Sequence, residues 1–131
     1  MPEDWLGTMP KGSFSTEGQL PNISDDRVKF IKGWFQETWS QAEKVIRENL
    51  DNSLFVHFDA DLYSSTLFAL TKMDSFHKPY YAIFDEFFGD ETRALYHYLK
   101  AYNADVEFLA KTDYAHGYPR QLLCKITPIS S

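Results

Sequence analysis

The chain has 131 residues, 44% of them hydrophobic and 17% aromatic, with a formal net charge of −6, which predicts one globular domain rather than a disordered chain. The acidic balance and the scattered Lys and Arg residues exclude a typical nucleic-acid-binding surface. A single cysteine, the lack of a long apolar run and the lack of a secretion-signal pattern favour a cytoplasmic protein with no membrane partner.

The amino-terminal quarter of the chain reads as a loop arm followed by the start of an α/β core. Residues 1–26 are rich in Gly, Pro, Ser and acidic residues, so we expect an arm there and the core over residues 27–131. Apolar and basic residues alternate over residues 27–33, which predicts a strand. Thr38 with Gln41 has the spacing of a capping box and predicts the start of a helix, with Trp34 and Phe35 before it in a loop.

Two strand-helix units of the same kind follow. The apolar run Leu54–Phe58 predicts a buried strand that leads through Asp59–Asp61 into a helix over about residues 64–76. Tyr80–Phe84 predicts a second strand, which leads into Asp85–Glu86. Each unit therefore places acidic residues directly after a strand.

The carboxyl-terminal part completes the predicted sheet. A helix follows Gly89, and strands are expected over Val106–Ala110 and Gln121–Ile126, with Cys124 in the core. The short connection between these two strands predicts that they are antiparallel to each other. The alternation of strands and helices predicts an α/β fold, a three-layer sandwich around a mostly parallel sheet with an antiparallel last strand.

The acidic residues form the main candidate site. If the two buried strands are parallel neighbours, Asp59, Asp61, Asp85 and Glu86 collect at one sheet edge, where open α/β sheets bind ligands. An extended backbone would point Asp59 and Asp61 the same way. Asp59, Asp85 and Glu86 suit Mg²⁺, and Asp61 could then accept a proton from a substrate hydroxyl. Acidic residues after strands also commonly cap helices, and that simpler role stays open.

Other residues carry weaker signals. His57 lies inside the first predicted strand, where a buried histidine with a hydrogen-bond partner is the commoner role. The sequence holds no Gly-x-Ser-x-Gly elbow, no Walker-type loop and no Gly-x-Gly-x-x-Gly motif. The acidic residues therefore remain the main chemical signal in the sequence.

Several segments together resemble the macrocin O-methyltransferase family, whose members use S-adenosylmethionine to methylate sugar hydroxyls of macrolides and similar natural products. The most specific of them is the block Asp-Ala-Asp-Leu-Tyr-Ser-Ser-Thr. The matching segments are Pro2–Trp5, Lys11–Ser15, Gly18–Pro21, Gly33–Thr38, His57–Thr66 and Phe84–Gly89. The resemblance implies a class I methyltransferase (Rossmann-like) fold, Mg²⁺ ligands at Asp59, Asp85 and Glu86, and Asp61 as the general base.

The resemblance also implies what the chain lacks. In such enzymes the first two strands and a glycine-rich loop hold most of the cofactor, and they should precede Pro2. We therefore expect the carboxyl-terminal part of a methyltransferase, which could be inactive alone. The lost strands would lie between the strands around Val28 and Val56, which leaves either a gap or direct pairing of these two. The resulting apolar sheet edge favours a homodimer.

Two other functions remain open. An Asp-x-Asp pair after an apolar strand also holds the metal of nucleotide-sugar glycosyltransferases, although that class doesn't require Asp85 and Glu86. The chain could instead be a non-catalytic remnant or a dimerising interaction module. The leading prediction is methyl transfer to a small-molecule hydroxyl, with a sugar as the expected acceptor.

Overall fold

The computed structural model describes residues 16–113 and 119–129. The predicted arm therefore lies partly outside the described residues, as does the middle of the connection between the last two predicted strands. Contacts within the chain divide it into two units, Met1–Glu48 and Asn49–Ser131.

The first unit contains helix α1, Phe35–Arg47, which begins earlier than predicted. Trp34 occupies the position before the helix, and its carbonyl accepts the backbone N–H groups of Glu37 and Thr38 at 3.0 Å each. The Thr38 hydroxyl also donates to this carbonyl, at 2.9 Å. The predicted capping box at Thr38 and Gln41 is therefore wrong, because Thr38 already lies inside the first turn.

The predicted strand over residues 27–33 is also wrong, since this segment has no regular secondary structure. The chain is organised locally instead: the Asp25 carboxylate accepts hydrogen bonds from the Arg27 backbone N–H and from its guanidinium. Alternation of side chains is not enough to make a strand, because a ladder partner must bond the backbone. Residues 16–26 hold neither helix nor strand, as expected for the described part of the arm.

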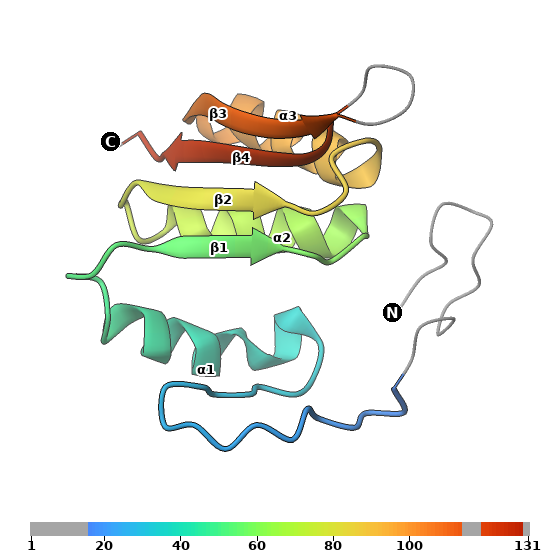
Figure 1. Ribbon diagram of the computed structural model, residues 1–131. Coiled ribbons are helices and arrows are strands. Elements are labelled where there is room, and N and C mark those ends of the chain that lie inside the picture. Colours follow the sequence, from blue (N-terminus) through green and yellow to red (C-terminus); the bar gives the residue numbers. More distant parts are fainter. Residues whose placement is uncertain (1–15, 114–118, 130–131) are drawn as a thin grey trace. The chain divides into compact units, whose positions relative to one another are not determined.

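The second unit is an α/β unit with one four-stranded sheet, shown in Figure 1. The sheet order is β1-β2-β4-β3, with β1 and β2 parallel and β4 antiparallel to both of its neighbours. The antiparallel last strand and the parallel pairing of β1 with β2 are confirmed, but the sheet is mixed rather than mostly parallel, because the pairings of β4 with β2 and with β3 are both antiparallel. The elements in chain order are β1 Phe55–Phe58, α2 Tyr63–Asp74, β2 Tyr80–Phe84, α3 Asp90–Tyr102, β3 Asp105–Asp113 and β4 Pro119–Thr127.

Helices α2 and α3 contact each other and lie along one face of the sheet, where the core of the second unit is buried (Figure 1). Alternate residues of the central strands β2 and β4 point into this core, as period-two burial requires. The most deeply buried apolar residues are Leu70, Ala82, Phe84, Ala94, Tyr98, Cys124 and Ile126. Cys124 is thus a core residue, as predicted. A three-layer sandwich needs helices on the second face as well, and that part of the fold stays a prediction.

The helices of the described residues have 12 or 13 residues each. None of these helices has the length and apolar character needed to cross a membrane. Helix α2 starts after Leu62 without a side-chain cap, and α3 ends at Asn103 in the left-handed conformation, where Asn is tolerated.

Candidate functional site

The register of β1 and β2 brings the two acidic segments to one sheet edge. Phe58 and Phe84 are paired residues at the ends of these parallel strands. The Asp85 backbone N–H continues the ladder by donating to the Phe58 carbonyl at 3.0 Å. Since neighbouring strands lie about 5 Å apart, the segments Asp59–Asp61 and Asp85–Glu86 leave the sheet side by side. The structure therefore brings the two acidic segments to the same end of the paired strands, as the sequence predicts.

The two aromatic residues beneath the acidic segments give this edge a rigid base. The rings of Phe58 and Phe84 are stacked, with centroids 4.8 Å apart and ring planes 8° apart. Both side chains are buried. Such pairs add about 0.5–1.5 kcal/mol to the stabilisation that burial already provides. Packing therefore fixes the strand ends from which the acidic residues project.

The backbone turns sharply at Asp61. Its φ angle is 58°, and the Leu62 N–H donates to the Ala60 carbonyl at 2.6 Å, which makes a tight three-residue turn. The condition under which Asp59 and Asp61 would point the same way, an extended backbone, is therefore not met at Asp61. A residue other than glycine at positive φ costs free energy, and such strain is concentrated at functional sites. Asp61 is held in an uncommon conformation immediately before α2 begins.

The acidic residues influence one another electrostatically. Partial burial raises the pKa of Asp61, and the negative charges of Asp59 and Asp85 raise it further. Partial burial also raises the pKa of Glu86, with added repulsion from Asp61 and Asp85, while Arg120 opposes the shift. A cation at this edge would relieve the repulsion among these carboxylates.

Asp85 is contacted by two residues from other strands. The side-chain amide of Gln121, near the start of β4, donates to Asp85 Oδ1 at 2.9 Å. The Nε2 atom of His57 on β1 lies 3.6 Å from the same oxygen. The prediction of a buried His57 is wrong, because its side chain is 53% exposed. The reason is its place on β1, whose residue 57 alternates with the buried Phe58.

Gln121 is a site residue that the sequence reasoning missed. The Phe87 backbone N–H donates to the Arg120 carbonyl at 2.7 Å, so β4 is tied to the loop after Glu86 just beside Gln121. The pair Asp85 and Gln121 is separated by 36 positions in the sequence. No local pattern announces a contact of this range.

Glu91, in the first turn of α3, is the second missed residue. Its side chain is 1% exposed, and its Oε2 atom accepts the Glu86 backbone N–H at 3.1 Å. Burial is the main cause that raises the pKa of Glu91 to about 8, against an ordinary value of 4.5. Helical spacing could have revealed it, because Glu91 precedes Leu95 by four residues and Tyr98 by seven and so lies on the apolar face.

The donor atoms at this edge are those that a hard cation prefers, namely carboxylate oxygens. Within residues 16–113 and 119–129, however, no three His, Cys, Asp or Glu side chains converge as a metal site. The chemistry of the side chains thus fits a divalent cation, while the predicted ligand set of Asp59, Asp85 and Glu86 stays a prediction.

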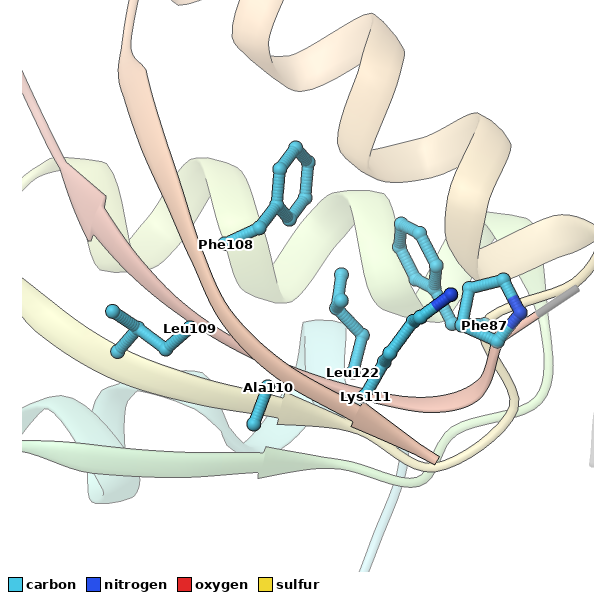
Figure 2. A pocket seen from close by; sticks show the side chains of 7 residues that line it. Phe87, Phe108, Leu109, Ala110, Lys111 and Leu122 are labelled. Carbon is cyan, nitrogen blue, oxygen red and sulfur yellow. The ribbon is translucent and has the colours of Figure 1, made fainter. Parts of the chain in front are cut away.

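An apolar pocket of about 390 Å³ adjoins the loop that follows Glu86. Figure 2 shows Phe108 and Leu109 of β3 on one part of its wall and Phe87 on another. Ala110 of β3 and Pro119 and Leu122 of β4 complete the apolar lining, and Lys111 adds one cation. Because Phe87 directly follows Glu86, polar and apolar surfaces lie next to each other along the chain here.

Comparison with known proteins identifies one family. The family model described as Macrocin-O-methyltransferase (TylF) matches residues 13–120, which include both acidic segments, Glu91 and most of the described residues. No curated protein and no solved structure matches the chain.

Proposed function

The chain belongs to the macrocin O-methyltransferase family, and from this we propose a function for its acidic edge, formed by Asp59, Asp61, Asp85 and Glu86 after strands β1 and β2. We propose that this acidic edge serves Mg²⁺-dependent methyl transfer to a hydroxyl of a sugar or related natural product. Membership of this family implies a methyltransferase that uses S-adenosylmethionine. The metal, the sugar acceptor and the residue roles are the parts that we propose. The observation that carries them is the Phe58 and Phe84 register, which sets the two acidic segments side by side.

Asp61 is the proposed general base. In the reaction the acceptor oxygen forms a bond to the methyl carbon as the bond from that carbon to the sulfonium sulfur breaks, which releases S-adenosylhomocysteine. The hydroxyl proton passes to an Asp61 carboxylate oxygen. The raised pKa of Asp61 supports this role, because a more basic carboxylate accepts a proton more readily.

Asp59, Asp85 and Glu86 are the proposed ligands of Mg²⁺. A divalent cation held by these carboxylates would supply Lewis acidity to an acceptor hydroxyl. The hydrogen bond from Gln121 supports the assignment of Asp85, because metal-binding carboxylates are commonly oriented by a second hydrogen-bonded residue. The apolar pocket beside Phe87 offers space for the less polar part of an acceptor.

The family match favours methyl transfer over the glycosyltransferase alternative. The activity of the 131-residue chain by itself is a separate part of the proposal. Its sequence holds no Gly-x-Gly-x-x-Gly loop, so we expect it to bind S-adenosylmethionine weakly. Calorimetric titration with the cofactor tests this, and tight binding would contradict it.

The residue roles can be tested by measuring S-adenosylhomocysteine release at high cofactor concentration with macrolide glycosides as acceptors. We expect release in Mg²⁺ and little in EDTA. Asp61→Asn should lower the rate by about 100-fold or more, since general bases contribute roughly 10²–10⁴. Asp113→Asn, at an exposed position on β3, is the control and should leave the rate unchanged. A full rate in EDTA, or an active Asp61→Asn variant, would contradict the proposed roles.

A further inference from the structure

Glu91 connects α3 to the acidic edge through the backbone. Its Oε2 atom accepts the Glu86 N–H at 3.1 Å, and the Asp61 backbone N–H also interacts favourably with its carboxylate. The residue thus contacts the acidic segment that follows β2 and the one that follows β1.

Glu91 makes this contact although burying its carboxyl group costs free energy. Glu91 is 1% exposed, and its Oε1 atom has no hydrogen-bond partner in the described part of the chain. A buried polar atom without a partner destabilises a fold, and an apolar side chain of similar volume would avoid that cost. The position lies on the apolar face of α3, next in spacing to Leu95 and Tyr98. Core packing alone would therefore favour a leucine or methionine there.

We propose that Glu91 is a positioning residue that holds the segments Asp59–Asp61 and Asp85–Glu86 in one fixed arrangement through their backbone N–H groups. This inference rests on the proposed function in one respect, that the arrangement it holds is the one that binds a divalent cation. Glu91 itself needs no contact with the cation. Its role explains how Asp61 stays in its tight turn while Glu86 stays beside it.

A simpler role for Glu91 is that of an acidic residue in the first turn of a helix, where the helix dipole favours negative charge. Such residues are usually solvated, and Asp90 fills that role at a more exposed position. The dipole also requires no contact with Glu86 or Asp61. The two roles therefore differ in what happens to these two backbone amides when the Glu91 carboxyl group is removed.

The test compares Glu91→Leu, Glu91→Gln and the control Glu107→Gln on the exposed edge strand β3 in the 131-residue chain. Glu91→Leu removes every acceptor, whereas Glu91→Gln keeps one carbonyl oxygen. Amide NMR shifts and hydrogen exchange of Glu86 and Asp61 are measured in metal-free buffer, and Mn²⁺ affinity is measured by calorimetry.

We expect Glu91→Leu to shift both amide signals, to speed exchange at Glu86 by at least 10-fold and to weaken Mn²⁺ binding by at least 10-fold. Glu91→Gln should restore protection at Glu86 and bring the affinity to within about threefold of the unaltered chain. If Glu91→Leu shifts the amide signals but the unaltered chain has no measurable Mn²⁺ affinity, the result would support the positioning role and contradict the proposed metal.

Unchanged Glu86 and Asp61 amides in a folded Glu91→Leu variant would overturn the inference. If Glu91→Leu does not fold, hydrogen exchange in the unaltered chain and in Glu91→Gln tests the inference instead. A Glu86 amide that exchanges in the unaltered chain as fast as an amide without a hydrogen bond would overturn it. A Glu86 amide that is protected in both proteins would support it.

Discussion

The side-chain amide of Gln121 donates a 2.9 Å hydrogen bond to Oδ1 of Asp85, so the last strand of the sheet holds an acidic residue that follows the second strand. The neighbouring backbone bond from Phe87 to Arg120, at 2.7 Å, ties the same loop to β4. The antiparallel strand therefore does more than complete the sheet. It fixes the orientation of one proposed metal ligand.

Removing this amide should weaken cation binding. We predict that Gln121→Ala lowers Mn²⁺ affinity by about 10-fold, because residues that orient metal ligands typically contribute 10- to 100-fold. Calorimetric titration of the folded variant measures the change. Gln41→Ala, at an exposed position on α1, is the matched control. Equal affinities for the two variants would show that Gln121 does not orient a ligand.

The stability of the metal-free chain should fall as pH rises from about 5 to 8. Burial raises the pKa of Glu91 to about 8, so the folded chain keeps a proton that the unfolded chain releases near the ordinary value of 4.5. The folded state then binds more protons across this window, and each such proton lowers the free energy of unfolding by about 1.4 kcal/mol per pH unit. Asp61 and Glu86, whose pKa values are also raised, contribute a fall of the same sign that begins near their ordinary values of 3.8 and 4.5.

Urea unfolding at several pH values in EDTA measures this dependence. Glu91→Gln removes the titrating group and should flatten the curve between about pH 5 and 8. The same slope in the variant and the unaltered chain would mean that Glu91 is not protonated in the folded state.

The stacked pair of Phe58 and Phe84 beneath the site should contribute to the stability of the fold. We predict that Phe58→Leu lowers the free energy of unfolding by about 1–2 kcal/mol, because the ring contact with Phe84 is lost while most of the buried volume is kept. Denaturant unfolding measures this loss, and Glu107→Ala on the exposed strand edge should change stability by less than about 0.5 kcal/mol. A loss no larger than that of the control would mean that the pair does not stabilise the strand ends.

Strand β1, the outermost strand on one side of the sheet, should support self-association. In the described residues β1 has β2 as its one ladder partner, and the side chain of Phe55 is 59% exposed. We predict a concentration-dependent dimer in sedimentation velocity, weakened by Phe55→Lys. Phe108→Lys is the control at the opposite edge strand, where Phe108 is 61% exposed. A chain that stays monomeric at all concentrations, or a dimer lost only in the control variant, would contradict this prediction.

The strand-helix units around the site were predictable because their signals are local. Tyr80–Phe84 is an apolar run bounded by Pro79 and Asp85, and it forms β2 as expected. The collection of acidic residues at one edge then follows from the parallel pairing of β1 and β2. The apolar runs and the positions of the acidic residues along the chain were sufficient to predict strand β2 and the meeting of the two acidic segments.

Features that depend on distant partners were not predictable in this way. The alternation over residues 27–33 is that of a strand, yet no ladder forms there, because pairing depends on a neighbouring strand rather than on the segment itself. The turn at Asp61 breaks the extended geometry that a two-residue spacing suggests. Gln121 lies within hydrogen-bond distance of Asp85 because β4 pairs with β2.

Titration of the 131-residue chain with Mn²⁺ or Mg²⁺, beside Asp85→Asn and the control Asp113→Asn, tests the central proposal most directly. We predict one divalent ion per chain, with affinity at least 10-fold weaker in Asp85→Asn and unchanged in Asp113→Asn. Absence of binding at millimolar metal, or equal affinity in all three proteins, would contradict a cation at this edge and the proposed roles of its carboxylates.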